Sequence, residues 1–176
     1  MANRQALREL QSRLADRLQS VRTEGVVVSW LAVRCGTTSY LLPLEQAGEI
    51  FPWTHVQAVP YTQPWFLGVA NLRGGLFGVV DVQGFVSGVA QAARSDMARQ
   101  DTRLVALNAR LEINCALLVD QLVGLRSAQS FATVQAPQAD APAFFGNLYV
   151  DPAGASWQEI NLQMLAKETT FLAIAS

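Results

Sequence analysis

The chain has 176 residues and a formal net charge of −1, with thirteen Lys and Arg residues against fourteen Asp and Glu residues. This balance provides no field that would draw the whole chain onto nucleic acid or anionic lipid, so both are excluded as main partners. Charged residues make up 15% and hydrophobic residues 51% of the chain, which excludes disorder and predicts that part of the surface meets protein.

The first predicted element is an amphipathic helix over residues 4–22. Its apolar stripe recurs at intervals of three and four residues, at Leu7, Leu10, Leu14, Leu18 and Val21. Gly25 ends the pattern, so we expect a helical extension over 1–25 and a second unit over 26–176. We expect the stripe to dock on the chain's own β domain, with self-pairing into a coiled coil as the alternative.

From Val26 onward, short β-branched and aromatic runs punctuated by Gly, Pro and Thr predict a mostly β body. The runs at 26–33 and 39–44 flank Gly36 and form a predicted hairpin. Residues 45–66 contain three prolines, each of which removes a ladder hydrogen-bond donor, so loops and one helical turn are expected there.

The clearest predicted hairpin joins strands 69–73 and 76–82 through the dipeptide Gly74-Gly75, which suits a two-residue primed turn. Strand alternation places Asn71 and Arg73 on one face, opposite to Leu72. Arg73 is therefore predicted to be displayed at a strand end beside the turn.

The second half is predicted to contain an exposed connection over 88–101, then strands, a flexible loop and a last strand pair. The predicted strands lie at 102–109, 112–122 and, in shorter form, at VGLRSA, and the loop covers 135–142. A turn at 151–154 joins the last two strands, and Asn161 can cap a short C-terminal helix. About nine or ten short strands result, which is typical of small barrels or a sandwich.

Two apolar runs end in aspartate, FGVVD at Asp81 and ALLVD at Asp120, and hint at two similar halves. An aspartate in this position more often accepts hydrogen bonds from nearby backbone N–H groups than performs acid–base chemistry. We therefore expect a structural role for both.

The sequence contains one histidine, His55, and neither a nucleophile motif nor a phosphate-binding glycine pattern. Cys35 and Cys115 lie 80 positions apart in apolar runs, which predicts reduced core thiols and excludes a structural zinc site. No stretch has the length of a membrane span or the features of a signal peptide, so a cytoplasmic location is expected. We predict no enzymatic activity, no catalytic residues, no cofactor and no metal.

The segment from Glu45 to Phe85 resembles the core motif of the CheW coupling proteins. In that family a GExx turn, a proline loop, a G-V-x-N-L-R-G hairpin and a VVD strand follow in this order. The later run LVALNARLEINCALLVDQLVGL is similar to the strand, hairpin and VVDxV strand of the same family. Within it, the sequence most resembles the PilI-type couplers of type IV pilus signalling.

This resemblance implies two small five-stranded SH3-like β-barrels packed together. It also implies a cytoplasmic adaptor that couples a methyl-accepting chemoreceptor to a CheA-type histidine kinase, in control of type IV pili and twitching motility. The implied partners are the receptor's cytoplasmic signalling tip and the kinase's regulatory domain, and the membrane is reached only through the receptor. A flagellar chemotaxis array is the alternative pathway, and a small-ligand-binding or catalytic barrel is the less favoured class.

The resemblance places a receptor-binding groove at Glu49, Arg73 and Leu125, with Gly68 and Asn71 shaping the loop that presents Arg73. An Arg–Glu pair at the rim of the groove can orient a helical receptor hairpin, and it can also be structural only. Both alternatives stay open at this point.

Several CheW proteins carry larger residues where Ala47 and Gly48 stand in this chain. We therefore expect a wider groove here and a different receptor.

Overall fold

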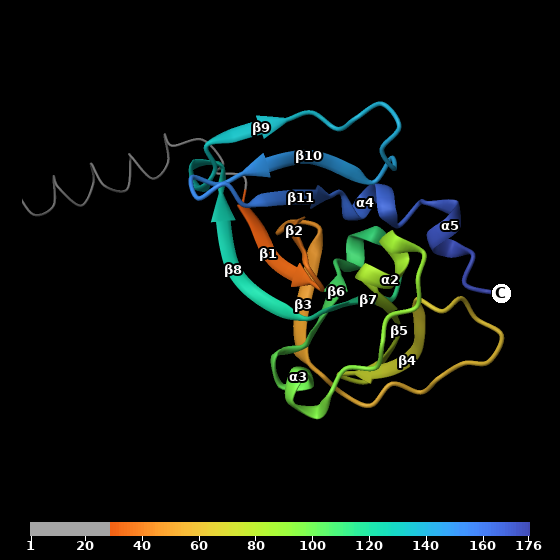
Figure 1. Cartoon of the computed structure of the whole chain (residues 1–176). Helices are drawn as coiled ribbons and strands as arrows, with labels where there is room; N and C mark the ends of the chain where they lie inside the picture. Colours follow the sequence, from red (N-terminus) through yellow and green to blue (C-terminus); the bar gives the residue numbers. More distant parts are fainter. Residues whose placement is uncertain (1–28) are drawn as a thin grey trace, which may run out of the picture.

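The strands of residues 29–176, the part of the chain that the computed structural model describes, form two mixed β-sheets (Figure 1). The first sheet contains β1 (Ser29–Cys35), β2 (Thr38–Pro43), β8 (Gln121–Ser127), β9 (Thr133–Gln135), β10 (Phe145–Val150) and β11 (Ser156–Ile160). These six strands have the order β8-β1-β2-β11-β10-β9. The predicted helix over 4–22 lies outside the described residues.

The second sheet contains β3 (Ala47–Pro52), β4 (Phe66–Leu72), β5 (Gly75–Asp81), β6 (Arg103–Leu107) and β7 (Cys115–Val119), in the order β3-β6-β7-β5-β4. The mostly β prediction is confirmed, but the expected count of five strands in each half holds for this sheet only. The sixth strand of the other sheet is β9, which pairs with β10 at the sheet edge. All three residues of β9 are exposed. The strand therefore lacks the alternation of buried and exposed residues by which a strand is predicted from sequence.

The helices in the described residues are short: α2 (Val82–Ser87), α3 (Asp96–Asp101), α4 (Leu162–Leu165) and α5 (Thr169–Leu172), with 3₁₀ turns at Ala109–Leu111 and Ala128–Ser130. The predicted cap at Asn161 is confirmed, because its side chain accepts a hydrogen bond from the backbone N–H of Met164 at 3.0 Å. Val82, expected in a strand, begins α2 instead. Asp81 stops the strand by capping this helix through the N–H of Gly84 at 3.0 Å.

The largest hydrophobic cluster contains residues of both sheets. Leu31, Val33 and Leu42 of the six-stranded sheet pack in the same buried cluster as Val105 and Leu117 of the five-stranded sheet. The predicted first hairpin is confirmed, since Cys35 pairs with Thr38 across a turn in which Gly36 has a φ of 59°. The two sheets therefore share an apolar seam.

The segment 47–52 was expected to be irregular and forms strand β3 instead. It pairs with β6 at one edge of the sheet, with Pro52 opposite Arg103 at the end of the strand. A proline in this place is tolerated because a missing donor at the end of an edge strand breaks no continuing ladder. The prediction of loops stays correct for most of residues 53–64.

The predicted strand over 112–122 is interrupted at Asp120. β7 ends at Val119 in the five-stranded sheet, and β8 begins at Gln121 in the six-stranded sheet. Asp120 is therefore the residue at which the chain passes from one sheet to the other.

Candidate functional site

Arg73 lies within the turn between β4 and β5, one residue earlier than the predicted turn. Leu72 pairs with Gly75, so Arg73 and Gly74 are the two turn residues, with φ values of 50° and 82°. Two positive φ angles define the primed turn that matches the twist of a hairpin. The primed turn was predicted correctly, but its position was wrong because Gly75 already belongs to the β5 ladder.

The side chain of Asn71 stabilises this turn. Its Oδ1 accepts a hydrogen bond from the backbone N–H of Gly74 at 2.9 Å. Arg73 is one of the few non-glycine residues with a positive φ, a conformation that costs roughly 1–2 kcal/mol. The Asn71 bond therefore offsets part of the cost of presenting Arg73.

Gly68 lies where the backbone of residues 57 and 58 crosses β4. Its φ is 130°, and a Cβ atom placed there would lie 2.0 Å from the carbonyl oxygen of Gln57. Gln57 and Val69 exchange two backbone hydrogen bonds of 2.8 and 2.9 Å beside it. Only glycine fits this position, so Gly68 fixes the path of the hairpin that carries Arg73.

Arg73 and Glu49 form an ion pair at the surface. Arg73 Nη2 lies 2.7 Å from Glu49 Oε1, and the two side chains are 77% and 42% exposed. Glu49 belongs to β3, and Arg73 follows β4, which are the two opposite edge strands of the five-stranded sheet. The sheet therefore curls until its edges approach each other, and the ion pair joins them.

The interior of this curled sheet contains a second apolar cluster. Leu72, Leu104 and Leu118 are buried in it, and Phe51 of β3 and Leu67 of β4 pack against the same cluster. Side chains of both edge strands thus share one core, as in a small barrel.

Leu125 lies on β8, an edge strand of the six-stranded sheet, and is 64% exposed. The structure therefore brings Arg73 and Glu49 into contact and places Leu125 on the other sheet. Two further exposed apolar side chains were not predicted, Ile50 next to Glu49 and Leu76 opposite Asn71 on the hairpin. Alternation could not have predicted this exposure, because Ile50 pairs with the buried Val105 and Leu76 shares a strand face with the buried Val80.

The expected widening of the groove at Ala47 and Gly48 is wrong. Ala47 is buried, and a Cβ atom at Gly48 would lie 2.9 Å from the carbonyl oxygen of Leu107. The backbone of β6 fills the space beside Gly48, so the small residue allows close strand packing and opens no groove.

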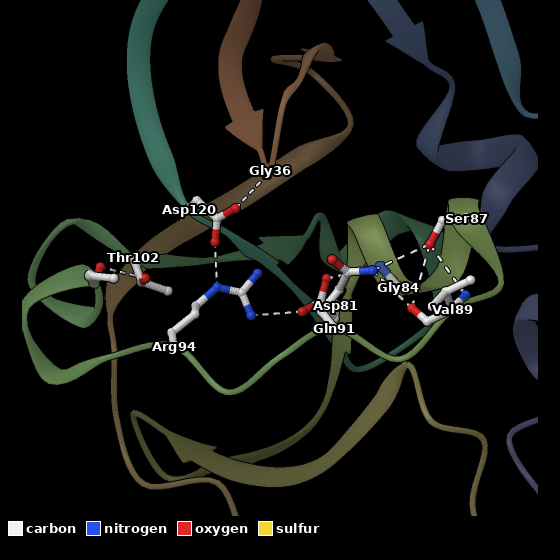
Figure 2. Close-up of polar contacts among 10 residues, drawn as sticks. Gly36, Asp81, Gly84, Ser87, Val89, Gln91, Arg94, Thr102 and Asp120 are labelled. Carbon is white, nitrogen blue, oxygen red and sulfur yellow. Dashed lines mark hydrogen bonds and ion pairs between the residues drawn. The ribbon is translucent and has the colours of Figure 1, made fainter.

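Figure 2 shows a second polar cluster, in which Arg94 lies between Asp81 and Asp120. Arg94 Nη1 lies 2.7 Å from Asp81 Oδ2, and Arg94 Nε donates to Asp120 Oδ1. Burial alone would lower the pKa of Arg94, but its hydrogen bonds to the two aspartates raise it. Asp120 also accepts a hydrogen bond from the N–H of Gly36 at 2.5 Å.

The prediction that these aspartates bind neighbouring backbone N–H groups is confirmed for Asp81, which accepts from Gly84. Asp120 accepts instead from Gly36, which lies far away in the sequence. The role of Arg94 was missed. It lies in the polar stretch 88–101, which was expected to be exposed, yet its side chain is only 15% exposed. No local pattern distinguishes it from the exposed residues around it.

The remaining candidates for chemistry are the two thiols and the histidine. Cys35 and Cys115 are free and buried, as predicted; burial raises the pKa of both thiols, that of Cys115 to about 12. His55 is exposed in a loop. Within residues 29–176, no cluster of three or more His, Cys, Asp or Glu residues could hold a metal ion, and no helix has the length and apolarity to cross a bilayer.

The structure thus consists of two sheets around a shared core, with an exposed ion pair beside a hairpin turn. The model of the CheW-like domain matches residues 29–168, so the chain belongs to the CheW-like domain family. It is accordingly a scaffolding protein without catalytic activity.

One relative among curated proteins is Protein PilI of Pseudomonas aeruginosa, 28% identical over 102 residues, which is 57% of this chain. The match spans about half of the length of that relative, 54%. Among solved structures, the scaffolding protein TtCheW from Thermoanaerobacter tengcongensis superposes with a TM-score of 0.63 at 18% identity, covering 77% of this chain and 89% of that one. This likeness shows a CheW-like fold.

Proposed function

We propose that this chain is a cytoplasmic adaptor that couples a methyl-accepting chemoreceptor to a CheA-type histidine kinase. Membership in the CheW-like family supports the adaptor role. The observation that carries the proposal is the exposed pair of Arg73, in the β4–β5 turn, and Glu49 of β3, where the two edge strands of the sheet approach each other. A charged pair in this position is suited to recognition, because an exposed ion pair contributes only about 0–1 kcal/mol to stability.

The proposed receptor site consists of Glu49, Arg73 and Leu125, with Gly68 and Asn71 fixing the hairpin. A helical receptor tip would place its apolar ridge against Leu125, while the ion pair sets its orientation and register. Ile50 of β3 and Leu76 of β5 are further exposed apolar side chains on the strands next to the ion pair. The kinase regulatory domain is proposed to bind a different surface of the same domain.

For the finer architecture, we propose an SH3-like barrel for each sheet, within one domain over residues 26–176 that follows a helical extension over residues 1–25. Closure of the five-stranded sheet supports this, since Arg73 and Glu49 join its edges.

The similarity to Protein PilI supports a type IV pilus pathway, and a flagellar array is the alternative. Deleting the gene for this chain in its host distinguishes the pilus pathway from the flagellar one. A loss of twitching with intact swimming supports the pilus pathway, and a loss of swimming chemotaxis alone contradicts it.

Binding measurements on folded variants test the receptor site. Arg73→Glu and Leu125→Asp should each weaken binding to a receptor signalling tip about a hundredfold, because charge reversal or loss of apolar contact in an interface costs several kcal/mol. Binding to the kinase regulatory domain should survive both changes. The matched control is Arg110→Glu, an exposed arginine of the 3₁₀ turn Ala109–Leu111, which should leave both affinities unchanged.

Two outcomes contradict the assignment of the site. In the first, both variants bind the receptor tip like the wild type. In the second, both lose receptor and kinase together with their melting transition, which would make Arg73 a structural residue.

A further inference from the structure

A cleft of about 520 Å³ opens between α2, α5 and the segment that leads into β10. Three aromatic side chains line it: Trp65, Phe85 and Phe144. Its volume lies in the range of small-molecule sites, which are mostly apolar with a few polar groups. None of the proposed receptor-site residues lines this cleft, so its role is independent of the proposed function.

The aromatic wall is held in place by ring contacts. The rings of Trp65 and Phe85 meet edge to face at a centroid distance of 5.0 Å, and Phe85 lies 5.6 Å from Phe144. Phe171 of α5 packs behind them, 5.2 Å from Phe85 and stacked on Trp65 at 6.1 Å. Trp65 and Phe144 are buried core residues and Phe85 is half-buried, so the ring contacts fix the wall in place before any ligand binds.

The wall formed by the C-terminal segment is also fixed. The N–H of Gln63 donates to the carbonyl of Ile174 at 2.8 Å, and the N–H of Ser176 donates to the carbonyl of Tyr61 at 3.1 Å. The side-chain amide of Gln63 adds a bond of 3.0 Å to the carbonyl of Ala175. These bonds keep α5 and its following residues against the loop before β4.

Glu168 is the one charged residue among the described residues that line the cleft. Its Oε1 accepts hydrogen bonds from the hydroxyls of Thr169 and Thr170 at 3.5 and 3.3 Å. None of the ion pairs within residues 29–176 includes it. A half-buried carboxylate thus stands beside an aromatic wall without a cationic partner from the described chain.

We infer that this cleft binds an organic cation, an alkylated ammonium or guanidinium group. Aromatic rings attract such a cation through their negative faces, and the attraction strengthens when the group is shielded from water. The carboxylate of Glu168 supplies the opposite charge, and the apolar wall accommodates the alkyl substituents. A purely apolar ligand would leave Glu168 facing it unpaired, so the chemistry of the lining favours the cation.

Titration of the full chain with choline, followed by tryptophan fluorescence and by the indole N–H resonance of Trp65, tests this inference. The comparison ligand is the uncharged tert-butyl analogue of choline, which has the same shape without the charge. We expect saturable choline binding that is at least about tenfold tighter than binding of the analogue. A parallel titration with a capped arginine distinguishes a side chain of a partner protein from a free ammonium metabolite.

Glu168→Gln removes the charge and keeps the hydrogen-bond acceptor, so it should weaken choline binding about tenfold with an unchanged melting temperature. The matched control is Glu45→Gln, an exposed carboxylate outside the cleft, which should bind choline like the wild type. Phe85→Leu keeps the site apolar but removes an aromatic ring. It should therefore also weaken binding of choline and leave binding of the uncharged analogue unchanged. Equal binding of charged and uncharged ligands, unchanged affinity in Glu168→Gln, or no binding of any cation would each overturn the inference.

Discussion

Arg94 Nη1 lies 2.7 Å from Asp81 Oδ2, at the end of β5 in the five-stranded sheet. The same guanidinium donates to Asp120, where the chain passes into the six-stranded sheet, and Asp120 in turn accepts from Gly36 in the β1–β2 turn. β5 and β7 run parallel side by side, so Asp81 at the end of β5 and Asp120 just after β7 lie at one end of the sheet. Figure 2 shows Arg94 between the two aspartates. Arg94 therefore connects the two sheets through a pair of carboxylates.

Arg94→Met should lower the free energy of unfolding by about 3 kcal/mol, because it leaves Asp81, which is almost fully buried, without its counter-charge. Urea denaturation followed by circular dichroism measures this. The matched control is Arg99→Met, since Arg99 pairs with the exposed Asp96 and lies over Trp53; it should cost less than about 1 kcal/mol. A loss below about 1 kcal/mol in Arg94→Met, like that expected for the control, would show that the connection through Arg94 does not stabilise the fold.

Gly68→Ala should destabilise the protein by about 3 kcal/mol or more, because its Cβ would overlap the carbonyl oxygen of Gln57 and the φ of 130° disfavours any side chain. Gly74→Ala is the comparison, since its φ is also positive but no atom lies within 4 Å of the added Cβ. Gly74→Ala should lower the free energy of unfolding by only about 1 kcal/mol, which is the cost of the backbone conformation alone. Similar urea midpoints for the two variants would contradict the close approach at Gly68.

Buried thiols predict an alkaline loss of stability. Burial raises the pKa of Cys115 from its ordinary value of 9.0 to about 12. Between these values the unfolded chain has released the thiol proton and the folded chain retains it, so stability falls as pH rises, by about 1.4 kcal/mol per pH unit. Below the lower value both states are protonated and the thiol contributes no pH dependence.

Urea denaturation at about pH 8 and about pH 10 tests the role of Cys115. Between these two pH values, the free energy of unfolding of the wild type should fall by about 1.4 kcal/mol more than that of Cys115→Ala. Only the thiol of Cys115 differs between the two proteins. Cys35 and Tyr40 also have raised pKa values, and both proteins retain them. Parallel pH dependences would contradict the prediction.

Local patterns were sufficient for features whose cause lies within a few residues. The turn at Gly36, the cap at Asn161 and the alternation that buries Ala70 and Leu72 all follow from neighbouring residue types. The position of the β4–β5 turn was missed by one residue, because Gly74-Gly75 matches a primed turn better than Arg73-Gly74, in which Arg73 must adopt a positive φ. The register is set by pairing of Leu72 with Gly75 along the whole hairpin.

Features that depend on distant segments could not be predicted in the same way. Arg94 looks like an exposed residue until β5 and β7 bring Asp81 and Asp120 to the same end of one sheet. The contact of Arg73 with Glu49 follows from curling of the sheet, which no periodicity encodes. The resemblance to CheW proteins predicted that Arg73 and Glu49 pair, and the ion pair of 2.7 Å confirms it. Local patterns alone could not have predicted the contact, because it depends on the closure of the sheet.

The leucine stripe over residues 7–21 remains a prediction about the N-terminal segment. Burial of each of the five apolar side chains would contribute roughly 1.5–3 kcal/mol. Because leaving all five exposed to water is unfavourable, we expect the stripe to dock on the β domain. The exposed side chain of Leu44 offers apolar surface beside the start of β1, where the N–H of Leu44 donates to the carbonyl of Ser29. Self-pairing into a coiled coil is less favoured because the stripe is under three heptads long.

Deleting residues 1–24 should therefore lower the melting temperature of a monomer by about 5 °C or more, since loss of a docked helix removes several kcal/mol of apolar burial. Sedimentation equilibrium on both chains provides the second readout. Leu44→Ser in the full chain is the matched variant, because it should reproduce part of the loss only if the stripe packs there. A dimer that becomes a monomer with an unchanged melting temperature would show instead that the stripe pairs with a second copy.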